Sequence, residues 1–272
     1  MGHYCTPIYS GNWSEKTKAE NESIYQLILD VLGDVDIKGV SHQIMMQFRD
    51  KVSKLPANRD KVARYKGKTI EQILSMKSVP PMSISTLNKY LVRTSTLFKW
   101  AAKHGYIPAN VAEGLTLKNA KKAEAEREEY STEDIQRILN NLKYDKAFPH
   151  LFWIPLIGMY QGMRLDEICQ LHVSDICVVD EVLCISVNRE GDKKLKNVAS
   201  ERIIPIHPML VRLGFMRYVE GLVKLNRPRL WGKLTKKRDG YSQDFGKAYQ
   251  RFNRKYVTKN PLRVLPSSKT RG

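Results

Sequence analysis

Cysteine, acidic residues and long apolar segments are all scarce in this 272-residue chain. Its four cysteines include no Cys-x-x-Cys pair, and no histidine stands at a spacing that completes a zinc site. A disulfide scaffold and a zinc module are therefore excluded. No apolar run approaches the roughly 18 residues of a membrane span, and the N-terminus lacks the apolar core of a secretion signal. We expect a cytoplasmic protein with no membrane partner and no metal.

Basic residues outnumber acidic ones by 46 to 28, and the excess is concentrated late in the chain. Residues 224–272 hold fifteen Lys and Arg but only two acids, Asp239 and Asp244, so this stretch carries +13 of the net charge of +18. A field of that size attracts a polyanion, and nucleic acid is the first candidate. A solubilising surface or a disordered basic tail would produce the same composition.

Apolar residues recur at helical spacing through the first part of the chain. The pattern predicts two amphipathic helices within residues 14–55 and a longer one that begins at a Ser83 or Ser85 cap and ends at Gly105. Residues 118–129 then carry four positive charges, four negative charges and no large apolar side chain. That composition is typical of a linker between two domains.

A second series of elements follows the linker. Ser131 and Asp134 form an acidic variant of the capping box, which predicts a helix with Ile135, Ile138 and Leu139 on its apolar face. Further helices are predicted over 152–160, 208–223 and 244–256, and strands over 182–187 and 202–206 flank a long basic hairpin tip. The predicted fold class is mainly α, of the α+β kind, with a helical first domain and a mixed second domain that holds a small sheet.

Two motifs of the second part bring together residues suited to phosphate chemistry. One is Gly162-Met-Arg164-Leu-Asp-Glu167, and the other is the hairpin run from Lys196 to Arg202-Ile-Ile-Pro205. In this order, after a helical module and a charged linker, they resemble the tyrosine recombinases, the family of phage integrases. The resemblance implies DNA strand cleavage and rejoining through a phosphotyrosine. It implies a SAM-like core-binding domain at 1–117, a linker at 118–129, a partial catalytic domain at 130–258 and a disordered or non-native tail at 259–272.

The resemblance assigns catalytic roles to residues of both motifs. Arg164 matches the family's first catalytic arginine, whose planar guanidinium can donate two parallel hydrogen bonds to a phosphate. Glu167, three residues on, is expected to orient it. Lys196 is predicted to be the general acid to the leaving 5′ oxygen, because it stands nine residues before Pro205, and Lys194 is the alternative. Arg164 could instead be a helix-end partner of Glu167, and the hairpin lysines a solvated strand edge.

Double-stranded DNA is the partner that the resemblance implies, with other recombinase subunits on the same DNA. It further implies a bacterial or phage-encoded protein without a cofactor. The predicted DNA contacts are basic residues of the 59–76 segment, the long helix and the hairpin: Lys61, Arg64, Lys66, Lys68, Lys89, Arg93, Lys99, Lys193, Lys194 and Arg202.

The family's second box, His-x-x-Arg, is missing from this sequence, since none of the six histidines is followed by Arg three residues later. The tyrosines after the hairpin lack the family's sequence context, and Tyr249 is expected on the core face of a helix. His172 and His207 are expected to cap or pack. We therefore expect a chain cut short before the second box and inactive alone. The alternatives are a non-catalytic DNA-binding competitor at recombination sites and an inert prophage remnant.

Overall fold

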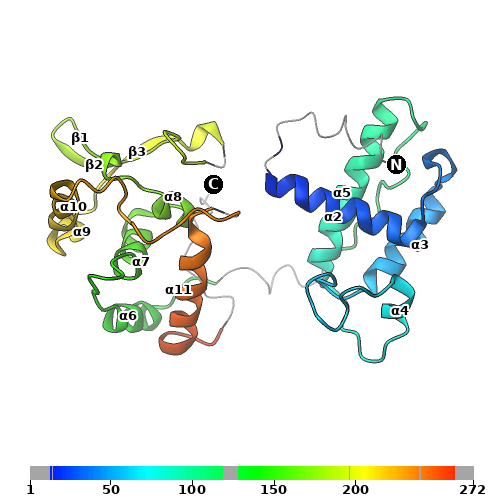
Figure 1. Ribbon diagram of the computed structural model, residues 1–272, viewed down its shortest axis with the longest axis horizontal. Helices are drawn as coiled ribbons and strands as arrows, with labels where there is room; N and C mark the ends of the chain where they lie inside the picture. The colour runs from blue at the N-terminus through cyan, green and yellow to red at the C-terminus, as the bar shows by residue number, and fades with distance from the viewer. Residues whose placement is uncertain (1–12, 14, 119–127, 196, 239, 261–272) are drawn as a thin grey trace. The chain divides into compact units, whose positions relative to one another are not determined.

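The chain divides into two compact units, 1–123 and 124–272 (Figure 1). The computed structural model describes residues 13, 15–118, 128–195, 197–238 and 240–260. The division falls inside the predicted linker at 118–129, most of which lies outside the described residues, as does most of the predicted tail at 259–272. Among the described residues, no helix has the length and apolar character needed to cross a membrane. A helical first unit and a small antiparallel sheet in the second confirm the predicted fold class.

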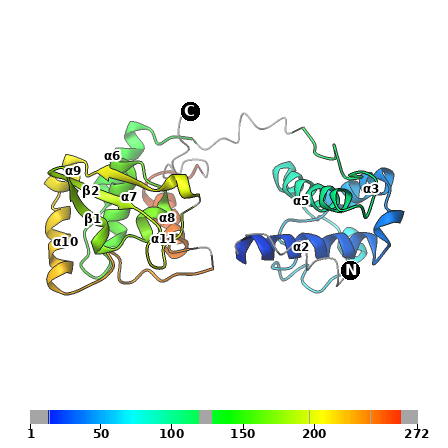
Figure 2. The ribbon, with the colours of Figure 1, turned by 90° about the horizontal axis from the view of Figure 1, so that it is seen from above.

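Unit 1 is built from helices that share one apolar core. They are α2 (Glu15–Leu32), η1 (Ile37–Gly39), α3 (His42–Ser53), α4 (Ile70–Leu74) and α5 (Ile84–Lys103). Helix α2 crosses α5 (Figure 1), and both contact α3, which lies at one end of the pair when the unit is seen from above (Figure 2). Ser83, and not Ser85, caps α5, because its Oγ accepts a hydrogen bond from the Thr86 amide at 3.2 Å. The predicted face of α5 is buried at Leu87, Leu91, Thr94, Phe98 and Ala101.

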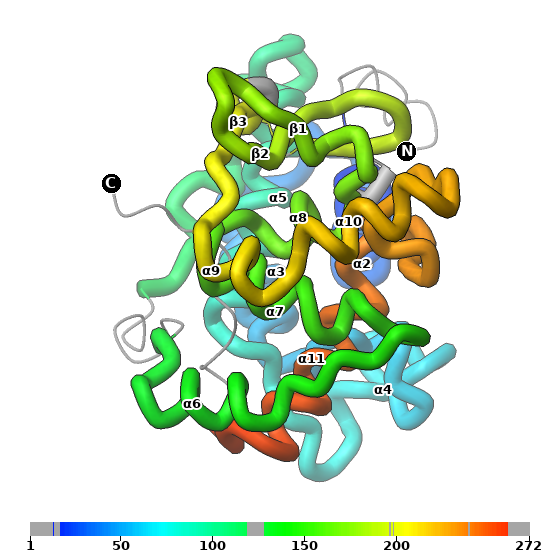
Figure 3. The backbone as a smooth tube through the Cα atoms, turned by 90° about the vertical axis from the view of Figure 1, so that its left-hand side faces the viewer, coloured from blue at the N-terminus to red at the C-terminus, as the bar shows by residue number. Residues whose placement is uncertain are grey.

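Unit 2 combines helices with a small sheet. In chain order its elements are α6 (Thr132–Asn141), α7 (His150–Gln161), α8 (Leu165–Cys169), η3 (Val173–Asp175), β1 (Ile176–Val179), β2 (Val182–Val187), η4 (Val198–Ser200), β3 (Arg202–Pro205), α9 (Pro208–Arg212), α10 (Phe215–Lys224) and α11 (Ser242–Tyr256). The sheet lies at one end of the unit, whereas α6 and the C-terminal end of α11 lie at the other (Figures 1 and 3). The fully buried side chains of Ile154, Phe215, Trp231 and Phe245 fill the core between them.

The sheet is antiparallel with strand order β1-β2-β3. Strand β2 agrees with the predicted 182–187, and β3 pairs with it so that Val187 faces Arg202. Strand β1 has no pattern that predicts it, because its residues Val178 and Val179 are exposed and buried and polar residues do not alternate along it. The pairing places the loop at 188–201 between two fixed strands. Motif residues of α8 and the hairpin can therefore meet at one end of the unit.

Two predicted helical features differ in the structure. The helix expected over 208–223 is broken between α9 and α10, where Gly214 adopts a φ of +92° that L side chains rarely take. The capping box of Ser131 and Asp134 forms as predicted. Of the three apolar residues predicted to form the face of the helix that follows, however, only Ile138 is fully buried. Ile135 and Leu139 are 39% and 38% exposed, so the predicted apolar face is wider than the buried one.

Candidate nucleic-acid site

Arg164 and Glu167 form a close ion pair at the junction of α7 and α8. Helix α7 ends at Gly162, and Arg164 is the residue that caps α8. The backbone amide of Arg164 donates to Oε2 of Glu167 at 3.0 Å, and its Nη1 donates to Oε1 at 2.7 Å. The carboxylate thus holds both the start of the helix and the guanidinium. This is the orienting contact that the spacing predicts, and the catalytic role of either residue stays a prediction.

Arg202, at the start of strand β3, pairs with the same carboxylate. Its Nη2 donates to Oε2 of Glu167 at 2.8 Å, and its Nη1 lies 3.3 Å from Oε1 and 2.9 Å from the Ser200 carbonyl oxygen. The Glu167 side chain is only 5% exposed. Burial acts to raise the pKa of Glu167, but hydrogen bonds from Arg202 and Arg164 outweigh it and leave that pKa below its ordinary value. Glu167 is therefore a buried anion shared by two cations.

Ser200 joins this cluster to the hairpin loop. Its hydroxyl accepts a hydrogen bond from Nη1 of Arg164 at 3.0 Å and donates one to the side-chain oxygen of Asn197. Asn197 follows Lys196, the predicted general acid, directly in the chain. Lys196 lies outside the described residues, yet the residue next to it is tied through one hydroxyl to Arg164. Ser200 carried no signal in the sequence analysis, because its partner is 36 residues away.

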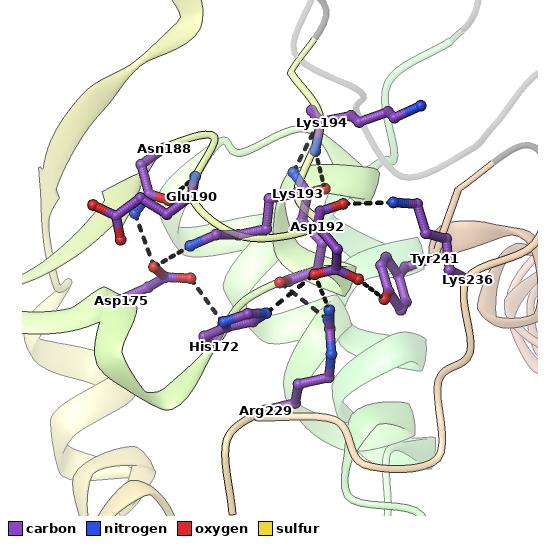
Figure 4. Close-up of polar contacts among 11 residues, drawn as sticks. His172, Asp175, Asn188, Glu190, Asp192, Lys193, Lys194, Arg229, Lys236 and Tyr241 are labelled. Carbon is purple, nitrogen blue, oxygen red and sulfur yellow. Dashed lines mark hydrogen bonds and ion pairs between the residues drawn. The ribbon is translucent and has the colours of Figure 1, made fainter.

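The other two hairpin lysines have different surroundings. Lys193 is buried, and its Nζ makes a 2.5 Å ion pair with Oδ1 of Asp175, with side-chain exposures of 2% and 1%. The predicted DNA contact at Lys193 is therefore wrong for this structure, since its ammonium is enclosed and already paired. The backbone of Lys194 exchanges hydrogen bonds with the Gln170 side chain at 2.9 and 3.0 Å. The Lys194 side chain is exposed and extends away from the Asp175 cluster (Figure 4).

Asp192 anchors the hairpin tip to the body of the unit (Figure 4). Its carboxylate accepts hydrogen bonds from Arg229 and from the Tyr241 hydroxyl, and Nε2 of His172 lies 3.5 Å from Oδ1. Its backbone carbonyl accepts a 2.6 Å hydrogen bond from Lys236. The Tyr241 hydrogen bond, with help from Arg229, lowers the pKa of Asp192. No sequence motif singles out Asp192, and Arg229 belongs to the basic excess of residues 224–272.

The basic residues predicted to contact DNA in unit 1 lie at its surface. Arg93 is half-buried and lies 3.8 Å from the Glu20 carboxylate. Arg64 is exposed but donates to the carbonyl oxygen of Lys77 at 2.7 Å, which orders the segment before α5. The exposed ones without such a contact among the described residues are Lys61, Lys66, Lys68, Lys89 and Lys99. Their positions are compatible with phosphate contacts, which remain a prediction.

Three of the four tyrosines after the hairpin pack in the core of unit 2, and the fourth is exposed. Tyr218 donates to the Leu230 carbonyl oxygen and Tyr241 to Asp192. Burial raises the pKa of Tyr218, Tyr241 and Tyr249. Tyr256 is 40% exposed at the end of α11, where its ring packs on Phe252.

The two histidines expected to cap or pack do so. His207 caps α9, with Nδ1 accepting from the Met209 amide at 3.1 Å. The His172 amide donates to Oδ2 of Asp175 at 2.8 Å, so His172 stands at the start of η3. Both histidines therefore have the structural roles that the sequence predicts.

Comparison with known proteins finds similarity only at the level of structure. No protein-family model and no curated protein matches the sequence. The Tn1549 transposon integrase in complex with transposon right end DNA superposes with a TM-score of 0.63 at 19% identity, over 98% of this chain and 81% of that one. The same integrase with a circular intermediate DNA gives a TM-score of 0.61 at 20% identity, with the same coverage. A lambda integrase tetramer bound to a Holliday junction gives 0.56 at 14% identity, over 99% and 76%. The chain therefore has the integrase fold, as its resemblance to the tyrosine recombinases implies.

Proposed function

We propose that this chain is a member of the tyrosine recombinase family that binds double-stranded DNA through its phosphates and does not cut it by itself. The observation that carries the proposal is the pair of guanidinium groups, Arg164 and Arg202, held on the buried Glu167 beside Ser200. The integrases with this fold were captured with transposon DNA or a Holliday junction, which supports DNA as the partner.

The chemistry of the family explains what such a site does. Cleavage through a phosphotyrosine passes through a phosphorane with extra negative charge on its non-bridging oxygens. Positioned donors aimed at such developing charge each lower a barrier by about 2.7–4 kcal/mol in well-studied enzymes. Arg164 is oriented for that role because Glu167 fixes its guanidinium and Ser200 limits its movement. The Lys196 ammonium is assigned the role of general acid, which gives a proton to the leaving 5′ oxygen.

Strand cleavage also needs a nucleophile and the family's second box. The sequence contains no His-x-x-Arg. Tyr218 and Tyr241 donate their hydroxyl hydrogens to structural acceptors, and Tyr249 lies in the core. Tyr256 is 40% exposed, but it lacks the sequence context of the family's nucleophile. Without an activated nucleophile, covalent catalysis cannot begin. We therefore assign to these 272 residues the occupation of DNA without cutting, as a competitor at recombination sites.

A nicked suicide substrate tests both halves of this proposal. Native gels should show a complex between the chain and duplex DNA, and denaturing gels should show no covalent adduct. A covalent adduct that disappears on changing one of the four tyrosines at 218, 241, 249 or 256 to Phe would overturn the assignment of a non-cutting protein. Failure to form any complex, by a chain that melts cooperatively, would overturn DNA binding. A chain with no cooperative melt would instead indicate the inert remnant.

A further inference from the structure

The two guanidinium groups on Glu167 leave positive charge uncompensated at one place. Glu167 supplies one negative charge, whereas Arg164 and Arg202 together supply two positive ones. The carboxylate is 5% exposed, but the arginine side chains are 35% and 34% exposed. The anion is therefore inside and the cations reach the surface. Such an arrangement carries a net charge of +1 that faces outward and attracts a further anion.

The donors of the two arginines are only partly used. Arg164 donates through Nη1 and its backbone amide, and its Nε and Nη2 have no hydrogen-bond partner among the described residues. Arg202 donates through Nη1 and Nη2 but not Nε within the same residues. Because both Nη1 atoms lie within 3.3 Å of Oε1, the two groups are neighbours on a single carboxylate. A guanidinium has five N–H donors, so each can hold Glu167 and still bind a phosphate oxygen.

We propose that Arg202 is a second phosphate-binding guanidinium, which acts with Arg164 on one phosphodiester of the DNA. This inference rests on the proposed function and extends it from a single catalytic arginine to a paired site. Glu167 and Ser200 are its positioning residues, since they touch the arginines and not the ligand. Strand β3 would thus supply a second guanidinium on the carboxylate that holds Arg164.

The hairpin offers a matched control for Arg202. Arg189 stands on the same hairpin and pairs with Glu201 at 2.5 Å, yet both side chains are exposed, at 48% and 43%, and neither touches Glu167 or Arg164 in the described residues. Changing Arg189 removes the same charge from the same hairpin without touching the paired site. It therefore separates loss of a positioned donor from loss of general positive potential.

The first test measures duplex affinity of the full chain as Arg202→Gln, Arg202→Lys, Arg164→Gln and Arg189→Gln. We expect Arg202→Gln to weaken binding by about ten- to hundredfold, the usual effect of losing a hydrogen-bonding group to a charged partner. It should also reduce the slope of log affinity against log salt by about 0.9. Arg202→Lys keeps the charge beside Glu167 and should fold, but it should remain about tenfold weak because the planar fork is lost. Arg189→Gln should change affinity by less than about threefold. An Arg202→Lys chain that melts like the wild type and binds DNA as tightly would overturn the proposal.

The second test separates this inference from the proposed function. Orthophosphate should raise the melting temperature of the wild-type chain and of Arg189→Gln above that in chloride at equal ionic strength, because a ligand bound by the folded state stabilises it. The increase should disappear in Arg202→Gln and Arg164→Gln. If the chain does not bind DNA but shows this pattern, DNA binding fails and the paired anion site stands. If Arg202→Gln keeps the full phosphate effect in that case, the paired site fails too.

Discussion

The buried ion pair between Lys193 and Asp175 gives a prediction about the stability of unit 2. Its two side chains are 2% and 1% exposed, and removing one partner of such a pair typically costs about 3–5 kcal/mol. In Lys193→Met, Asp175 would keep two neutral donors, the Asn188 side chain at 2.9 Å and the His172 amide at 2.8 Å. We therefore expect the lower end of that range, about 3 kcal/mol. For a unit of about 150 residues this corresponds to a fall in Tm of about 6–12 °C.

Tryptophan fluorescence during urea unfolding would measure this effect. With Trp13 and Trp100 changed to Phe, the signal comes from Trp153 and Trp231, which are both buried in the core of unit 2. Arg189→Met is the control, because its ion pair with Glu201 is exposed and should contribute no more than about 1 kcal/mol. Equal small losses in Lys193→Met and Arg189→Met would refute the reasoning that the buried Lys193 pair costs more to break than an exposed pair.

Two further predictions concern α8 and the loop before α11. Arg202 and Arg164 lower the pKa of Glu167, so the stability that the Glu167 carboxylate contributes should be complete above its unfolded pKa of 4.5 and lost as pH falls through the lower folded pKa. In acid unfolding, the difference in stability between wild type and Glu167→Gln should therefore be constant above pH 4.5 and shrink below it. A difference that grows in acid would contradict this. Gly240→Ala should destabilise unit 2 by more than about 1 kcal/mol in the same urea assay, since φ there is +104° and the added Cβ would meet the Asp166 carboxylate at 2.5 Å. Gly232→Ala, where a Cβ meets nothing within 4 Å, is the control, and equal losses in the two variants would show that the strain argument is mistaken.

Local signals in the sequence predicted local structure well. The period of apolar residues placed α5 and its buried face, strand alternation placed β2, and the spacing of Ser131 and Asp134 placed a capping box. The same spacing rule predicted the contact between Arg164 and Glu167, three residues apart. These interactions depend on neighbours along one helix or strand, so their pattern is written in consecutive residues.

Contacts between distant residues were not predictable in this way. Lys193 pairs with Asp175, which is 18 residues away in the sequence, and Arg229 pairs with Asp192, which is 37 residues away. Lysine in a polar hairpin predicts an exposed edge, and only the fold of the loop over η3 turns Lys193 inward. The role of Arg202 as a second partner of Glu167 likewise depends on β3 pairing beside α8, which no spacing within either motif encodes.

Duplex affinity across a salt series tests the central claim, binding through phosphates, most directly. If the basic surface and the paired arginines neutralise ~6–10 phosphates, affinity should fall by about 10³–10⁵ between roughly 50 and 200 mM salt, with little dependence on sequence. An affinity that stays constant over this range would contradict the account, because binding to phosphates releases counterions and must therefore weaken as salt rises.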